Sequence, residues 1–330
     1  MTSKTTAPPN WAEHYTPAHR RQAQDATAWL DSHGLKRSWL GRQIKGSEAT
    51  ISQVLSGSYP SDPSHWLTRI AEVMDRHRDR ATALKVPYVE TSVARVVTAG
   101  CRRAHMYRNF SVVSAFVGTG KTEALRRYRD SHANVVMVEA DPDMSPGALL
   151  MEICDLTGAV AAVRGNRVSR GTTADRFTAV IKALRGTDSL LVVDEAETLQ
   201  ARSLHHIRRI RDKAGIGVVL AGTEYLSSLI RPEHGQFDQI RSRVGFWPDV
   251  ITGLSRADSD ALVHAALGDG ADTALLSAVW AYSQGSARVL CEALLPNLHD
   301  YGTQQGKALT PDLVHAVAKD VLSLKPRRAA

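Results

Sequence analysis

The sequence predicts an α/β protein whose parallel-sheet core lies between an N-terminal all-helical domain and a C-terminal helical domain. Three patterns predict this class. Apolar residues recur at helical spacing from Ala18 to about Arg78, short apolar runs alternate with helical segments after Phe110, and only helical patterns follow Ser255. A chain of 330 residues that is 43% hydrophobic has the length and composition of more than one soluble domain.

Charge and cysteine content exclude several classes of protein. Residues 1–110 carry 16 Lys and Arg against 9 Asp and Glu, whereas residues 111–330 carry 25 of each. The net charge of +7 therefore lies in the first third, which indicates either a polyanion-binding region or a solubilising surface. No apolar run approaches the roughly 18 residues of a membrane span, so we expect a cytoplasmic protein with no membrane partner. The cysteines Cys101, Cys154 and Cys291 have no metal-ligand spacing, so we expect no disulfide framework and no zinc site.

The first 80 residues predict a flexible arm followed by a small helical domain. Residues 1–17 contain three prolines and are expected to form the arm. The helices are expected over 18–33, 39–44 (capped by Ser38), 49–55 and 66–78. The middle pair, two short helices around a glycine-containing turn, is typical of a helix-turn-helix domain, which we place at 18–80.

This domain resembles the helix-turn-helix domains of Cro and the phage repressors. The resemblance lies in Leu40-Gly41-Arg42 and in Ser47-Glu48-Ala49-Thr50-Ile51-Ser52-Gln53-Val54-Leu55-Ser56-Gly57. It implies that the second helix enters the major groove and brings to the DNA bases Glu48, Thr50, Ser52 and Gln53. Arg42 and Lys45 would then contact phosphates. The alternative is a helical bundle that packs or docks a protein, and a linker helix, expected from Val89 to about Met106 within 81–110, leads on to the core.

The pattern that begins the core is a phosphate loop. A strand over 111–114 leads into Ala115-Phe116-Val117-Gly118-Thr119-Gly120-Lys121-Thr122, and a helix over 123–129 follows. Glycines let backbone N–H groups wrap a phosphate, the helix N-terminus adds positive charge, and the lysine reaches the β and γ oxygens. We therefore predict that ATP is bound by Gly118, Thr119, Gly120, Lys121, Thr122 and Glu123.

Two carboxylates follow a later apolar strand. A second strand over 135–139 and a helix over 146–156 come first, and then Leu190-Leu191-Val192-Val193 delivers Asp194 and Glu195 to the carboxyl end of a strand. Ligands of parallel sheets bind at that end. We predict that Asp194 and Thr122 hold Mg²⁺ and that Glu195 orients the attacking water.

Three further residues are predicted to act on the γ-phosphate. Thr223 follows a strand over 217–222 and is assigned as a sensor, with capping of the next helix as the alternative. Arg243, with Arg241 as the second choice, is assigned as an arginine that reaches the site of a neighbouring subunit, and the alternative is an ordinary surface pair. Arg288, in a helical lid, is expected to contact the nucleotide.

The lid completes the expected domain organisation. Its helices are expected over 256–267, 271–282, 287–299 and 311–322. The α/β core is assigned to 111–254, the lid to 255–324 and a basic tail to 325–330.

This order of phosphate loop, acid pair, sensor, arginine and lid resembles the AAA+ ATPases. Within them the sequence is similar to phage Mu transposition protein B and the transposon target-selection ATPases. The similar segments are Val117-Gly118-Thr119-Gly120-Lys121-Thr122-Glu123-Ala124, Leu191-Val192-Val193-Asp194-Glu195-Ala196 and Ile216-Gly217-Val218-Val219-Leu220-Ala221-Gly222, together with Ser242-Arg243. The sequence departs from the family at Ala115, where glycine is usual, at Thr223, where asparagine is frequent, and at Arg241, where a less polar residue is usual.

The resemblance implies a bacterial or phage-encoded, ATP- and Mg²⁺-dependent ATPase that assembles as a filament or ring on double-stranded DNA and activates a partner transposase. Hydrolysis would dissolve the assembly. A basic loop over 164–171 is either solvated or a DNA contact of the core, through Arg164, Arg167 and Arg170. A helicase-loader-like remodeller and an ATP-switched transcriptional regulator remain the alternative functions.

Overall fold

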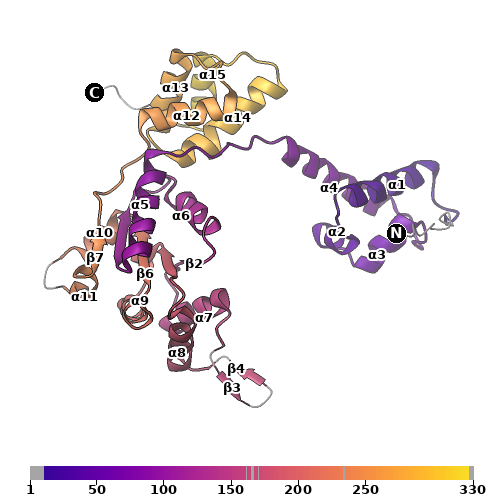
Figure 1. The fold of residues 1–330 in the computed structure, drawn as a ribbon. Helices are drawn as coiled ribbons and strands as arrows, with labels where there is room; N and C mark the ends of the chain where they lie inside the picture. The colour runs from indigo at the N-terminus through magenta and orange to yellow at the C-terminus, as the bar shows by residue number, and fades with distance from the viewer. Residues whose placement is uncertain (1–10, 161, 165–166, 170, 233–234, 327–330) are drawn as a thin grey trace. The chain divides into compact units, whose positions relative to one another are not determined.

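The computed structural model describes residues 11–160, 162–164, 167–169, 171–232 and 235–326 (Figure 1). The chain divides into two compact units at Ala83 and Leu84. The first unit is helical, and its helices are α1 (Pro17–Ser32), α2 (Arg37–Ile44), α3 (Glu48–Ser56) and α4 (Ser64–Thr82). Apolar residues from all four helices form one core, and Leu40, Ile51 and Ile70 are almost fully buried in it.

The first unit differs from the sequence prediction at two places. Residues 11–15 were assigned to the flexible arm, but Tyr15 is 2% exposed and its hydroxyl donates to the Val54 carbonyl. Trp11 packs against the same core, so these aromatic side chains fix the segment to the helices. The predicted cap of the second helix is also wrong: Lys36 occupies the N-cap position without a side-chain bond, and Ser38 lies inside α2.

The second unit is built on a five-stranded parallel sheet with the order β2-β5-β6-β1-β7. Its strands are β1 (Phe110–Ser114), β2 (Val135–Glu139), β5 (Leu190–Asp194), β6 (Gly217–Gly222) and β7 (Val244–Phe246). Alternate residues of the central strands point to opposite faces, and both faces are buried. The strands therefore appear in the sequence as nearly continuous apolar runs.

Helices cover both faces of this sheet. On one face, Val113 and Val192 pack against α5 (Ser92–Tyr107) and α6 (Lys121–Asp130). On the other, Val112 and Val193 share a core with α7 (Pro146–Thr157), α8 (Thr173–Leu184), α9 (Ala201–Ala214) and α10 (Glu224–Ile230). Short elements join them: η1 (Ala196–Thr198) after β5 and α11 (Asp238–Arg241) before β7.

A hairpin and a shorter linker helix replace two predicted elements. The basic stretch predicted to be a loop forms the antiparallel pair β3 (Ala162–Arg164) and β4 (Arg167–Ser169). Three-residue strands are too short to show an alternating pattern in the sequence. The linker helix starts at Ser92 rather than Val89, because the Thr91 hydroxyl caps it by accepting from Ala94 N.

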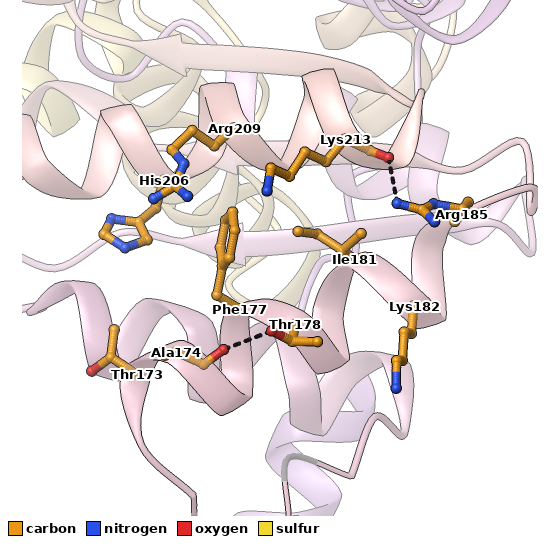
Figure 2. A pocket seen from close by; sticks show the side chains of 10 residues that line it. All are labelled: Thr173, Ala174, Phe177, Thr178, Ile181, Lys182, Arg185, His206, Arg209 and Lys213. Carbon is orange, nitrogen blue, oxygen red and sulfur yellow. Dashed lines mark hydrogen bonds between the residues drawn. The ribbon is translucent and has the colours of Figure 1, made fainter.

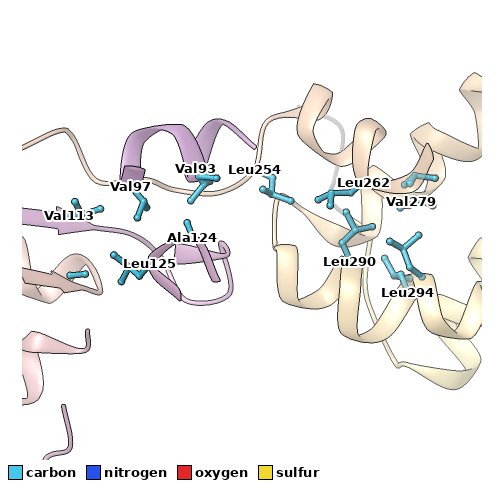
Figure 3. Packing of buried hydrophobic residues seen from close by; sticks show 14 of the residues in the cluster. Val93, Val97, Val113, Ala124, Leu125, Leu254, Leu262, Val279, Leu290 and Leu294 are labelled. Carbon is cyan, nitrogen blue, oxygen red and sulfur yellow. The ribbon is translucent and has the colours of Figure 1, made fainter. Parts of the chain in front are cut away.

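The C-terminal part of the second unit is a helical lid. Its elements are α12 (Arg256–Leu267), α13 (Thr273–Ser283), η2 (Val289–Leu294), α14 (Leu295–His299), η3 (Asp300–Gln304), α15 (Pro311–Ala316) and η4 (Val317–Val321). Figure 3 shows one apolar cluster running from Val93 and Ala124 through Leu254 to Leu262 and Leu290. The lid is therefore attached to the core through a continuous apolar contact.

A buried carboxylate reinforces the attachment of the lid. Asp258 of α12 accepts hydrogen bonds from the backbone N–H and the hydroxyl of Ser92, at 2.8 and 2.5 Å. It also accepts from the N–H and hydroxyl of Ser255, which caps α12. One side chain thereby joins the first turn of α5 to the first turn of α12.

Candidate nucleotide site

The loop between β1 and α6 is shaped by glycine. Gly118 and Gly120 have φ values of +76° and +95°, in the left-handed region that favours glycine. Gly120 is the N-cap residue of α6, so the loop directs the positive end of a helix into the space above it. A cradle of this kind suits a phosphate group.

The lysine and threonine that follow this loop converge on the buried end of β5. The Lys121 ammonium donates to Asp194 Oδ1, and the Thr122 hydroxyl donates to Asp194 Oδ2 at 2.6 Å. Asp194 is 0% exposed and also accepts from Glu195 N at 2.9 Å. The sequence predicted these three side chains to share a site, and the structure brings them into direct contact.

Two more glutamates lie beside this cluster. Glu195 is exposed and takes a left-handed conformation, with φ +54°, at the turn into η1. Glu197 approaches Gly222 so closely that a Cβ on that glycine would clash with Glu197 Oε2. Its Oε1 accepts from Thr223 N at 2.8 Å. Glu197 therefore fixes the residue that follows β6.

Thr223 does not use its hydroxyl as a helix cap. It stands at the N-cap position of α10, yet its side chain makes no capping hydrogen bond. Its Oγ1 is buried and has no protein partner in the structure, and the same is true of Thr119 Oγ1. Buried hydroxyls normally have partners, so these two favour a polar ligand at the site.

A pocket of about 490 Å³ joins these groups. It is lined by the phosphate loop, by Glu195, Glu197 and Thr223, and by lid residues that include Arg288 and Cys291. Burial raises the pKa of the Cys291 thiol to about 11, so this sulfur stays neutral. The pocket combines a phosphate cradle, a lysine and several glutamates, with Asp194 bonded to that lysine, and this set of groups fits ATP with a divalent cation.

The lid closes this pocket through the backbone. Arg288 N donates to the Gly118 carbonyl at 2.9 Å, and its exposed guanidinium lies 3.8 Å from the Glu292 carboxylate. The structure therefore brings Arg288 to the phosphate loop from the lid side, where the sequence analysis expected it.

Comparison with known proteins finds a matching domain family and similar transposition proteins. The model of the AAA domain family matches residues 103–230. Transposition protein B of the Mu-like prophage FluMu of Haemophilus influenzae is 27% identical over 243 residues, 72% of this chain and 82% of that protein. The ATP-dependent target DNA activator B of Escherichia phage Mu is 25% identical over 251 residues, 75% of this chain and 78% of that protein.

The chain therefore carries an AAA domain within a sequence that is similar to the Mu B proteins. Among solved structures, Cdc6p from Pyrobaculum aerophilum has the same fold, with a TM-score of 0.54 and 18% identity over 72% of this chain and 69% of that chain. The predicted class, a phosphate-loop α/β core with a parallel sheet and a helical lid, is confirmed.

The arginines predicted to act on a neighbouring ATPase subunit lie outside the pocket of their own chain. Arg243 Nε donates to Asp212 Oδ1 at 3.0 Å, and Arg241 Nε donates to Asp238 Oδ1 at 3.2 Å. The Arg243 carbonyl accepts from Phe110 N, at the start of β1 and thus at the end of the sheet opposite the phosphate loop. Neither arginine is among the residues that line the nucleotide pocket.

The predicted DNA-contacting residues of this ATPase divide into two groups. Arg42, Lys45 and Gln53 are exposed on α2, α3 and the turn between them. The Thr50 hydroxyl is hydrogen bonded to Ser47 Oγ, and Ser52 accepts from Arg37 at 2.8 Å. In the core, Arg170 lies outside the described residues, and only the backbone is described at Arg164 and Arg167.

Sequence reasoning missed two parts of the ATPase pocket. Glu197 was not singled out, although its position two residues after Glu195 was a signal for a third carboxylate. Residues 89–91 were assigned to the linker helix and 86–88 to no element, but residues 86–89 and Thr91 line the pocket, and the Tyr88 ring stacks under Arg127 at 4.5 Å. Pro87 and the cap at Thr91 were signals that the helix starts later.

The described residues contain neither a ready-made cluster of metal ligands nor a helix able to span a membrane. No group of three or more His, Cys, Asp and Glu side chains is arranged to hold a metal ion by itself. Within the same part of the chain, none of the helices has both the length and the apolar character that crossing a membrane requires.

Proposed function

We propose that this AAA+ ATPase acts in DNA transposition: in its ATP-bound form it assembles on duplex DNA, delivers that DNA as a target and activates a partner transposase in the bacterial cytoplasm. One observation carries the proposal. The chain whose pocket is lined by Lys121 and Thr122, both bonded to the buried Asp194, is similar over three quarters of its length to a protein named ATP-dependent target DNA activator B.

The residues of the pocket would have different roles in ATP hydrolysis. Backbone N–H groups from Gly118 to Thr122 would surround the phosphates, and Lys121 would leave Asp194 to bind the β and γ oxygens. Thr122 and Asp194 would hold Mg²⁺, which supplies positive charge to the phosphate oxygens. Both side chains already point at one another, which supports this assignment.

Attack on the γ-phosphate would depend on two further residues of the pocket, Glu195 and Thr223. Glu195, exposed into the pocket, would orient the water, and Thr223 would donate its unpartnered hydroxyl to the γ-phosphate. Glu123 and Arg288 complete the proposed nucleotide ligands from the helix start and from the lid.

The proposed DNA contacts belong to both units. Arg42 and Lys45 would contact phosphates and Gln53 base edges, as in a helix-turn-helix domain. Thr50 and Ser52 would contact DNA only after exchanging their present hydrogen bonds. Arg164, Arg167 and Arg170 are the proposed contacts of the core. Phosphate-dominated binding gives an affinity that falls steeply with salt and varies little with sequence.

Electron microscopy with duplex DNA, with and without ATP, tests the proposal. We expect filaments or rings only with ATP, none with Lys121→Ala, and persistent assemblies with Glu195→Gln, which binds ATP but hydrolyses it slowly. A Glu195→Gln variant that leaves DNA as fast as the parent would contradict the role of hydrolysis.

Two other results would favour the alternative functions. A footprint confined to one palindromic operator would favour the transcriptional regulator, and loading of a helicase without filaments would favour the helicase loader.

A further inference from the structure

A second pocket, of about 630 Å³, lies between α8 and α9 on the side of the core that carries α7. Figure 2 shows its floor, where the Phe177 ring rises from α8 toward α9 beside Ile181. It shares no lining residue with the nucleotide pocket. No step of the proposed ATPase reaction uses it.

The rim of this pocket is cationic. Lys182 and Arg185 are three residues apart on α8 and its C-cap, and Arg209 and Lys213 are four apart on α9, so the members of each pair are neighbours on a helix surface. In Figure 2, Arg185 points toward α9, whereas Lys182 points away from it. All four are exposed, and His206 adds a fifth basic side chain. Among the described residues that line the pocket, none is acidic.

Contacts within the chain hold these cations around the aromatic floor. Arg209 lies 4.6 Å and Lys213 5.8 Å from the centroid of the Phe177 ring. Arg185 donates to the Lys213 carbonyl at 3.2 Å and thus links the ends of the two helices. The neighbouring carboxylate on α9, Asp212, is bound instead to Arg208, Arg211 and Arg243.

This arrangement calls for an anionic ligand. Like charges three or four residues apart on a helix repel one another, and an anion seated between them removes that repulsion. The floor adds a second, smaller requirement: Phe177 and Ile181 are 8% and 7% exposed, and a ligand that covers their exposed edges gains from apolar contact.

Two kinds of polyanion could be considered, and the groove favours one. The pocket is a narrow concavity between two packed helices, which an extended peptide can follow, whereas the broad surface of a DNA duplex touches only its ridges. A phosphate backbone also offers little apolar surface to Phe177. We propose that this groove binds an acidic peptide segment of a partner protein, with carboxylates on the cationic rim and one apolar side chain on Phe177.

Fluorescence anisotropy with the full chain and a labelled peptide tests the proposal. The probe is a synthetic peptide of about twelve residues, rich in Asp and Glu, with one central Leu. We expect saturable binding that is weakened roughly tenfold by replacing the Leu with Ser. The protein variant Lys182→Glu/Arg209→Glu should weaken binding about tenfold or more, because it reverses two rim charges.

A matched variant separates the groove from the overall charge. Arg202→Glu/Lys319→Glu makes the same change in net charge at exposed positions outside the groove and should bind the peptide like the parent. ATP hydrolysis and affinity for duplex DNA should stay at the parent level in both variants, which also shows that they fold.

Three outcomes overturn the proposal. The first is no binding to the parent protein, and the second is an equal loss in the groove and matched variants. The third is a loss of duplex DNA affinity confined to the groove variant while peptide binding persists, which would assign the groove to the phosphate backbone.

Discussion

Thr223 shows how a single hydroxyl separates two roles. A threonine after a strand and before a helix is a normal N-cap, and a cap would leave nothing for a phosphate. In the structure the backbone N–H is held by Glu197 while Oγ1 stays buried without a partner. The position is therefore rigid while the hydroxyl is available to a ligand.

We expect Thr223→Val to lower the rate of ATP hydrolysis roughly tenfold to a hundredfold while changing ATP affinity little, because the hydroxyl is assigned to the transition state. Thr223→Ser keeps the donor and should recover most of the rate. Steady-state kinetics and equilibrium nucleotide binding measure the two effects. If Val retains the parent rate, Thr223 does not sense the phosphate.

At the scale of elements, the lid depends on the hydrogen bonds of Asp258. Burial alone would raise the pKa of this carboxyl, but hydrogen bonds from Ser92 and Ser255 outweigh burial and lower it. A lowered pKa in the folded state means that the carboxylate stabilises the fold fully above the ordinary value of about 3.9. This stability is lost as the pH falls through the lowered value.

We expect Asp258→Asn to reduce the free energy of unfolding by about 2 kcal/mol at neutral pH, because it leaves N–H and O–H donors facing an amide. The loss should shrink as the pH falls from about 4 through the lowered pKa of Asp258, because the unfolded carboxyl is protonated first and the folded carboxyl only below that lowered value. Urea unfolding at several pH values measures it. Asp269→Asn, at an exposed loop position, is the control, and an equal loss there would remove the special role of Asp258.

The elements also show what a sequence can predict. The strands over 135–139 and 217–222 were found with correct bounds, because strands buried on both faces form continuous apolar runs. β7 was not found, since it has three residues with a glycine in the middle. The fixed segment 11–15 was also missed, because its order comes from contacts of Trp11 and Tyr15 with residues some 40 positions away.

The candidate site also contains residues that the sequence predicts and residues that it does not. Lys121, Thr122 and Asp194 were predictable because a phosphate loop and the carboxyl end of a neighbouring strand have fixed positions in this class of sheet. Glu197 and Tyr88 reach the pocket through a close approach to Gly222 and through an extended connection, and the local signals for both residues do not show these tertiary contacts.

At the scale of the whole molecule, the proposed assembly requires Arg243 to serve another copy. Its guanidinium is bound to Asp212 at the end of the sheet away from the phosphate loop, so a neighbour would have to draw it from that partner. Exposed or half-exposed ion pairs are weak, which keeps this exchange accessible.

We expect mixtures of two inactive variants to recover activity. Arg243→Ala keeps an intact pocket, and Lys121→Ala keeps the arginine, so mixed assemblies contain complete sites that neither variant forms alone. ATPase rates measured across mixing ratios on duplex DNA should pass through a maximum. Rates that merely average those of the two variants would show that Arg243 does not act between subunits.

The segment 84–91 has two structural roles. Most of it walls the nucleotide pocket, and it is also the stretch of chain by which the second unit continues from the helical unit before it. Trypsin acting at the exposed Lys85 would therefore sever the chain and open the pocket in one cut. A nucleotide bound against Val86 and Tyr88 should shield that bond, so the rate of cleavage at Lys85, read from the fragments of the digest, becomes a gauge of occupancy.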